Sequence, residues 1–237
     1  MRNALHPPAN EELVGIFNAF EKDESLRVAI LTGTGTESFS AGNDLKYMAS
    51  GNPVWIPNAG FAGLTSRTNR VKPVIAAVNG LALGGGLEIA MACDIIVAAD
   101  HALFGLPEVK VGLFAGAGGV QRLSRQIGIK PAMEMLLTGQ PINCEKALAL
   151  GLINYAVPSN QLLQKAEAIA TLISQASPDA IRSTLQLLHV TAKYASTDEA
   201  VTAPHTVFDD LVNSADFWEG SRAFAEKRKP NWTLKEV

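Results

Sequence analysis

Three short apolar segments without polar alternation constrain the fold of this chain more than any other feature. They are residues 28–32, 74–78 and 95–99, and each is closed by Gly, Asn-Gly or Asp. A strand with one face in water alternates apolar and polar residues, whereas a strand covered on both faces does not. The segments therefore predict a largely parallel sheet with helices on its faces, which is an α/β fold.

Helix signals surround these strands. We expect a first helix capped by Asn10 and further helices between the strands, at 43–50, 60–70 and 85–93. After residue 115 the signals are almost continuously helical. The helices expected there are 118–127, 131–137, 145–150, 161–175, 178–194, 198–213 and 216–227. This pattern predicts a core domain over residues 1–185, followed by a helical region over 186–237.

Composition excludes several function classes. The 237 residues are 47% hydrophobic and carry a formal charge of −3, so no overall positive field favours nucleic acid or an anionic membrane as a partner. No segment has the apolar length of a signal peptide or a membrane span. Cys93, Cys144 and four dispersed histidines show neither disulfide nor metal-ligand spacing. We therefore expect a cytoplasmic protein without a metal.

Two glycine-containing loops are candidates for binding an anion or an oxyanion. Gly84, Gly85 and Gly86 stand at the start of the helix predicted at 85–93, whose free N–H groups would point at a ligand. A second loop, residues 40–45, follows the first strand, and an amide there could pair with that of Gly85 to hold one developing negative charge. Asp44 in this second loop could equally be the cap of the next helix.

Two glutamates suggest acid/base chemistry. Glu88 stands directly behind the three glycines in an apolar segment, and Glu108 follows twenty residues later, after Gly-Leu-Pro. A carboxylate buried among aliphatic neighbours must be paired or neutralised. Glu88 could instead pair with a buried arginine, and Glu108 could be an exposed loop residue. If both face one water or one carbon, coupling would raise at least one pKa.

Motifs along almost the whole chain resemble those of the crotonase, or enoyl-CoA hydratase/isomerase, superfamily. They are AILTG (29–33), FSAGNDL (39–45), KPVIAAVNG (72–80), ALGGGLE (82–88), CDII (93–96), FGLPE (104–108), GAGG (116–119) and EGSRAFAEKR (219–228). The resemblance implies a spiral of βαβ units with a C-terminal helical region that builds homotrimers, often stacked as hexamers. It also implies an acyl-CoA thioester substrate and no separate cofactor, because CoA is part of the substrate.

The resemblance assigns a role to each site residue. The amides of Asn43 and Gly85 would form the oxyanion hole, and the residues along the CoA moiety would be Asn43, Asp44, Leu45 and Lys46. Glu88 would activate water and Glu108 would supply a proton. Because many isomerases of the superfamily lack one of the acids, the complete pair favours hydration of 2-enoyl-CoA to 3-hydroxyacyl-CoA, as in fatty-acid β-oxidation.

Alternatives stay open beside this interpretation. One carboxylate is enough for a Δ3,Δ2-enoyl-CoA isomerase, and residues 60–65 resemble those of carnitinyl-CoA dehydratases. A non-catalytic acyl-CoA-binding or RNA-binding protein is a further alternative, with a basic patch of Arg222, Lys227, Arg228 and Lys229. The chain also departs from the family pattern. Asn43 replaces a small apolar residue, and the strand pair usually found before the position of Arg2 is missing.

Overall fold

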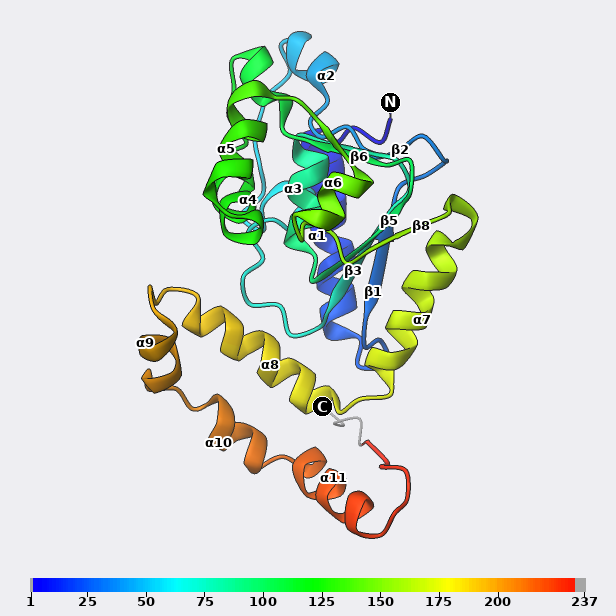
Figure 1. The fold of residues 1–237 in the computed structure, drawn as a ribbon, viewed down its shortest axis with the longest axis vertical. Helices are drawn as coiled ribbons and strands as arrows, with labels where there is room; N and C mark the ends of the chain where they lie inside the picture. The colour runs from blue at the N-terminus through cyan, green and yellow to red at the C-terminus, as the bar shows by residue number, and fades with distance from the viewer. Residues whose placement is uncertain (1, 233–237) are drawn as a thin grey trace. The chain divides into compact units, whose positions relative to one another are not determined.

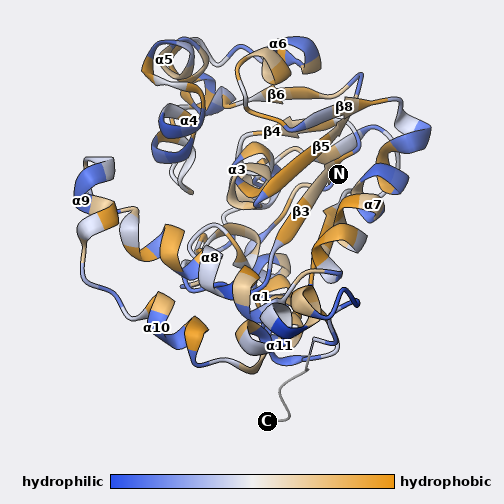
Figure 2. Cartoon of the chain, turned by 60° about the horizontal axis from the view of Figure 1, so that its bottom comes forward, coloured by the Kyte–Doolittle hydropathy of each residue, from blue (hydrophilic) through white to orange (hydrophobic). Residues whose placement is uncertain are grey.

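The strands of the protein form two sheets in the computed structural model, which describes residues 2–232 (Figure 1). The first sheet has the order β1-β3-β5-β8, with strands Ala29–Thr32, Val74–Val78, Ile95–Ala99 and Tyr155–Val157. β3 and β5 run parallel and every residue of β3 is buried. Figure 2 shows both as continuously hydrophobic strands, as expected when helices cover both faces. The three strands predicted from the sequence are confirmed.

The second sheet is not evident in the sequence. Its order is β2-β4-β6-β7, with strands Ser38–Ser40, Leu81–Leu83, Leu103–Gly105 and Ile142–Asn143. β4 runs parallel to β2 and to β6, and β7 is antiparallel to β6. Strands of two or three residues are too short to display a periodicity of two, so pattern reasoning could not find them.

The chain passes from one sheet to the other in a repeated order. β1, β3 and β5 belong to the first sheet, and each is followed directly by a strand of the second, β2, β4 or β6. Helix α2 (Leu45–Ala49) and the short 3-10 helix η1 (Phe61–Gly63) lie between β2 and β3, and α3 (Gly85–Ala92) connects β4 to β5. Each turn therefore adds one strand to each sheet, and the predicted α/β spiral of βαβ units is confirmed.

The first helix, α1 (Pro7–Lys22), begins earlier than expected. The ring nitrogen Nδ1 of His6 accepts the N–H of Ala9 at 3.0 Å and so satisfies a free donor of the first turn. Asn10 is buried, and its side-chain oxygen accepts the N–H of Ala62 at 2.7 Å. The prediction that Asn10 caps the helix is wrong, because this side chain makes a tertiary contact instead.

No regular helix forms over residues 60–70, contrary to expectation. The segment contains only η1 and turns. Gly60 has a φ of 85°, Ala62 of 53° and Gly63 of 63°, and the left-handed region interrupts a right-handed helix. The apolar spacing of this segment arises from burial of a turn.

The remaining helices agree closely with the predictions. They are α4 (Gly119–Ile127), α5 (Ile129–Thr138), α6 (Cys144–Ala149), α7 (Leu162–Ser174), α8 (Pro178–Thr191), α9 (Thr197–Thr202), α10 (Val207–Val212) and α11 (Ala215–Ala225). Two further 3-10 helices, η2 (Pro107–Val111) and η3 (Ser159–Gln161), complete the set. The single helix expected over 198–213 is divided into α9 and α10, because Pro204 between them has no N–H to donate.

The described residues form two compact units. The first contains the chain up to residue 19, residues 30–67 and residues 74–169, and the second contains residues 20–29, 68–73 and those from 170 onward. Within the second unit, α8 packs against α10 and α11. The helical C-terminal region is thus present, while the domain boundary expected at residue 185 stays a prediction.

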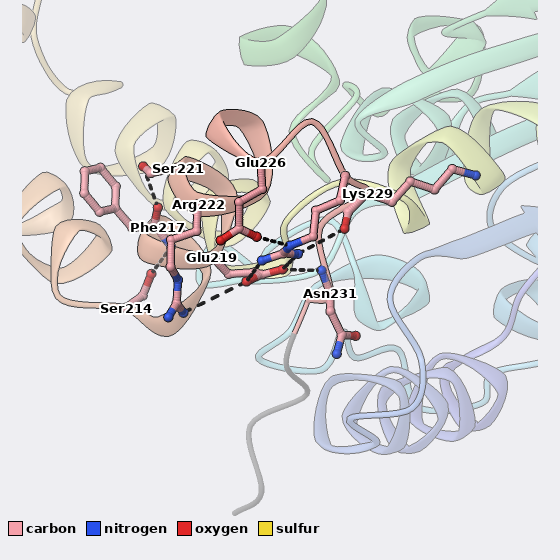
Figure 3. Close-up of polar contacts among 9 residues, drawn as sticks. Ser214, Phe217, Glu219, Ser221, Arg222, Glu226, Lys229 and Asn231 are labelled. Carbon is pink, nitrogen blue, oxygen red and sulfur yellow. Dashed lines mark hydrogen bonds and ion pairs between the residues drawn. The ribbon is translucent and has the colours of Figure 1, made fainter.

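A cluster of charged residues closes the end of α11 (Figure 3). The Glu219 carboxylate accepts two hydrogen bonds from the Arg228 guanidinium, at 2.6 and 3.0 Å, and one from the N–H of Asn231 at 2.6 Å. The bonds from Arg228 and Asn231 lower the pKa of Glu219 to about 2. Arg228 also bonds to Glu226, and Arg222 lies 4.0 Å from Glu219. Two members of the basic patch are therefore ion-paired, which weakens its attraction for a polyanion.

Candidate active site

Glu88 lies in the first turn of α3 and is only 3% exposed. Its oxygen Oε1 accepts the N–H of Gly119 at 2.8 Å. Burial raises the pKa of Glu88 to about 7; the Gly119 hydrogen bond and the charge of Arg122 oppose this rise, and the charge of Glu108 adds to it. A carboxyl group with a pKa near neutrality can both accept and release a proton under ordinary conditions.

Glu108 lies beside the start of the same helix. It belongs to the 3-10 helix η2, and its oxygen Oε1 is so close to Gly84 that a Cβ added there would lie 3.2 Å away. Its other oxygen, Oε2, is buried and has no hydrogen-bond partner in residues 2–232. Burial also raises the pKa of Glu108. The structure thus brings the two predicted acids together, and one of them has an oxygen free to bond to a ligand.

The two candidate oxyanion amides come from neighbouring loops. Gly85 is the first residue of α3, so its N–H has no acceptor within the helix. Gly42 has a φ of 83°, and a Cβ on it would lie 2.6 Å from the Gly85 nitrogen. Asn43 forms a parallel bridge with Leu5: the N–H of Leu5 donates to the Gly42 carbonyl, and the N–H of Asp44 donates to the Leu5 carbonyl. The N–H of Asn43 itself therefore points away from Leu5. The loops therefore meet as the sequence predicts.

The aromatic ring of Phe61 packs against Gly85. A Cβ on Gly85 would lie 2.5 Å from Cε1 of Phe61, so the ring and the glycine are in direct contact. The N–H of Phe61 donates to Oγ1 of Thr65 at 2.8 Å. The next residue, Ala62, is buried with a φ of 53°, a conformation that costs about 1–3 kcal/mol and persists only where its surroundings enforce it. A strained, buried turn thus holds the Phe61 ring against Gly85, next to the candidate oxyanion hole.

Gly119 is a site residue that spacing alone could not identify. A Cβ on it would lie 2.6 Å from Cβ of Ala115 and 2.9 Å from Oε1 of Glu88, so only glycine lets its N–H reach the carboxylate. The GAGG motif at 116–119 is one of the motifs that resemble the family, but it assigns no role to Gly119. Neither Phe61 nor Arg122 was singled out in advance.

The segment expected along CoA is accessible to solvent in part. The Asp44 carboxylate accepts the N–H groups of Lys46 and Tyr47 at 3.0 and 3.2 Å, which confirms it as the cap of α2. These two bonds lower the pKa of Asp44. Leu45 is 47% exposed and Lys46 is exposed as well. Asn43 to Lys46 therefore remain available to a ligand, and their contact with CoA stays a prediction.

Other kinds of site find little support in residues 2–232. No group of three or more His, Cys, Asp or Glu side chains is arranged to hold a metal ion there. Cys93 and Cys144 are both buried as free thiols. None of the described helices has the length and hydropathy needed to cross a membrane. The carboxylate pair and the adjacent amides are therefore the candidate active site.

Known proteins with related sequences are enzymes acting on CoA thioesters. The chain is 44% identical over 236 residues to a mevalonyl-coenzyme A hydratase of Aspergillus fumigatus, covering 98% of this chain and 87% of the relative. It is 38% identical over 239 residues to a carnitinyl-CoA dehydratase of Proteus mirabilis, covering 97% and 90%. Both comparisons extend over nearly all of the chain.

Solved structures and a family model lead to the same result. The crystal structure of an enoyl-CoA hydratase from Mycobacterium tuberculosis superimposes with a TM-score of 0.91 and 39% identity, covering 99% of this chain and 91% of that one. A hydratase from Mycobacterium marinum matches equally well, at a TM-score of 0.91. Residues 1–235 match the model of the enoyl-CoA hydratase/isomerase family. The chain therefore belongs to the enoyl-CoA hydratase/isomerase family.

Proposed function

We propose that the protein reversibly adds water to a 2-enoyl-CoA thioester and forms a 3-hydroxyacyl-CoA. The observation that carries this proposal is the pair of carboxylates beside the amide of Gly85: Glu88, which is buried, and Glu108, which is half-buried with its Oε2 atom inaccessible to solvent. An isomerase moves one proton between two carbons, for which a single carboxylate suffices. Water addition requires a base for the water and an acid for the carbon, and two carboxylates meet both needs.

The residues divide the reaction as follows. The N–H groups of Asn43 and Gly85 hydrogen-bond to the thioester oxygen and stabilise its negative charge as the enolate forms. Ionised Glu88 takes a proton from water while the water oxygen bonds to C3, and the C2=C3 electrons move toward the thioester. Protonated Glu108 then donates to C2. One proton exchanged between the two acids restores the starting state, and dehydration follows the same steps in reverse.

The electrostatics of the two acids support proton transfer at neutral pH. Burial raises the pKa of both acids, that of Glu88 to about 7, so each carboxyl group holds a proton more readily than an exposed glutamate does. The Gly119 N–H stabilises the ionised form of Glu88, which favours Glu88 as the base. Oε2 of Glu108 has no hydrogen-bond partner within residues 2–232, so this carboxyl group is free to act as the proton donor.

Amide substitution of each acid tests the proposal. Glu88→Gln and Glu108→Gln are each expected to lower the turnover of crotonyl-CoA by about a hundred- to ten-thousandfold. Turnover is measured as the rate at which the enoyl absorbance decreases. Glu12→Gln, on the exposed face of α1, is the matched control and is expected to keep wild-type turnover. Wild-type turnover in either site variant would refute the two-acid mechanism. Mass analysis distinguishes hydration, which adds water, from isomerisation.

A second candidate is the dehydration of a substituted 3-hydroxyacyl-CoA, such as carnitinyl-CoA. It is favoured by relatives of that activity at 38–40% identity and by the resemblance of residues 60–65 to carnitinyl-CoA dehydratases. Phe61 of this segment lies directly against Gly85, so the segment is close enough to influence the acyl group. A panel of crotonyl-, longer enoyl-, carnitinyl- and mevalonyl-CoA, compared by kcat/KM, separates the two. Participation in cytoplasmic β-oxidation requires a preference for unsubstituted enoyl chains.

Assembly into a homotrimer or hexamer is part of the same proposal. Several large apolar side chains of the C-terminal helices are exposed in the single chain: Leu188, Val201, Phe208, Trp218 and, at 87%, Phe224. Exposed apolar surface of this kind indicates a protein interface. Size-exclusion chromatography with light scattering is expected to give three or six times the 25.1 kDa mass of one chain. A single-chain mass would refute this assembly.

A further inference from the structure

Arg122 joins two segments of the site that are far apart in the sequence. It lies in the first turn of α4, and its guanidinium donates from Nη2 to the carbonyl of Thr65 at 2.6 Å and from Nη1 to the carbonyl of Ala117 at 3.3 Å. Arg122 is partly buried and packs directly against Gly118, where a Cβ would overlap its guanidinium. The hydratase mechanism described above assigns no step to this arginine.

Each of the two carbonyls belongs to a segment that holds a reacting group. Ala117 stands two residues before Gly119, whose N–H bonds to Glu88. Thr65 accepts the N–H of Phe61, whose ring lies against Gly85. A planar guanidinium with donors in a fixed geometry can connect two such acceptors rigidly, whereas an ammonium group acts as a single point.

We propose that Arg122 is a positioning residue that holds residues 115–119 and 60–65 together, and thereby keeps Glu88 and Gly85 in their reactive arrangement. This inference rests on the proposed hydratase function, because Glu88 and Gly85 are the groups that it serves. In this role Arg122 acts through its bonds to the carbonyls of Thr65 and Ala117 and not through contact with the substrate. Its removal frees the Gly119 loop from Thr65 and loosens the bond between Gly119 and Glu88.

The charge of Arg122 provides a readout that a purely structural role would not move. Two charged groups act on Glu88, Glu108 from η2 and Arg122 from α4. The elements β2, β4 and η1, which also pack on α3, contain no titratable side chain. Arg122 favours the ionised form of Glu88 and so lowers its pKa. Loss of this positive charge therefore raises the pKa of Glu88, and a smaller fraction of the base is ionised at pH 7.

The test combines a titration without substrate and a measurement of turnover. Glutamate carboxyl groups are labelled with ¹³C, and the Glu88 resonance is assigned by its absence in Glu88→Gln. In Arg122→Gln the titration midpoint of Glu88 is expected at higher pH than in the wild type. In Arg122→Lys, which keeps the charge but cannot bridge both carbonyls, it is expected between the wild-type value and that of Arg122→Gln. Arg125→Gln, three residues later on α4 and exposed, is the matched control and is expected to titrate as the wild type does.

Turnover of crotonyl-CoA completes the test. Arg122→Gln is expected to lower kcat on the order of a hundredfold with little change in KM, because the reacting groups and not the CoA contacts are displaced. Arg122→Lys is expected to lose a large part of kcat, since one ammonium group cannot bridge both carbonyls. An unchanged Glu88 midpoint in Arg122→Gln, or wild-type kcat in Arg122→Lys, overturns the inference. Absence of turnover in the wild type refutes the proposed function instead, and leaves the titration to decide on Arg122.

Discussion

The burial of Glu88 predicts a pH-dependent loss of stability that Glu88→Gln removes. The pKa of Glu88 rises from 4.5 to about 7 on folding. Below pH 4.5 this carboxyl group is protonated in both the folded and the unfolded state, and it contributes nothing. Between pH 4.5 and 7 the unfolded state releases the proton first, so the free energy of unfolding falls as the pH rises. Above pH 7 the loss is complete.

The magnitude follows from the size of the rise. One pH unit corresponds to about 1.4 kcal/mol, so a rise from 4.5 to about 7 corresponds to about 3 kcal/mol. The glutamine of Glu88→Gln keeps an oxygen to accept the Gly119 N–H but adds N–H donors in a buried position, which changes stability by an amount independent of pH. The useful quantity is therefore the difference between variant and wild type as the pH changes.

Urea unfolding measures this difference at fixed protein concentration, in steps from pH 4.5 to pH 8. We expect Glu88→Gln to gain about 3 kcal/mol relative to the wild type over this range, with most of the change below pH 7. Glu12→Gln, an exposed substitution, is expected to stay within about 0.5 kcal/mol of the wild type throughout. A constant difference between Glu88→Gln and the wild type would refute the reasoning, because it would mean that Glu88 titrates alike in both states.

Three further predictions follow from contacts of the site. Gly42→Ala forces a Cβ to 2.6 Å from the Gly85 nitrogen at a φ of 83°, so a loss of kcat of about a hundredfold is expected in the hydration assay. A wild-type kcat would mean that the contact between these two loops is not needed for the reaction. Glu108→Gln removes a negative charge beside Glu88, so the titration midpoint of Glu88 should move to lower pH in the ¹³C experiment. An unchanged midpoint would mean that the two carboxyl groups do not interact. Asp44→Ala removes the cap of α2 and should lower the urea midpoint of unfolding; an unchanged midpoint would mean that the cap contributes nothing.

Part of the candidate site could be read from local patterns. The cap at Asp44, the helix after the triple glycine and the burial of Glu88 are consequences of neighbouring residues, and all three agree with the structure. The proximity of Glu108 to Glu88 is different, because the segment between them contains β5 and β6. Only the family motifs suggested that proximity before the structure was known.

The side chains that support the site were hidden from pattern reasoning. Asn10 looks like a helix cap in the sequence, yet it accepts the N–H of Ala62, 52 residues away. Arg122 looks like an ordinary polar residue of an amphipathic helix, yet it bonds to Thr65, 57 residues earlier. A polar side chain offers the same donors and acceptors to a local or a distant partner, so its partner depends on which segments meet.

The amino-acid sequence determined the buried parallel strands, most of the helices and the family, because these depend on apolar periodicity, caps and contiguous motifs. Folding decided the rest: the second sheet, the strained turn at Ala62, and the convergence of Glu88, Glu108 and Gly119. The bond between Glu88 and Gly119 spans 31 residues. Such a contact is formed when packing brings two segments together, and burial, which raises the pKa of Glu88, exists only in the packed state.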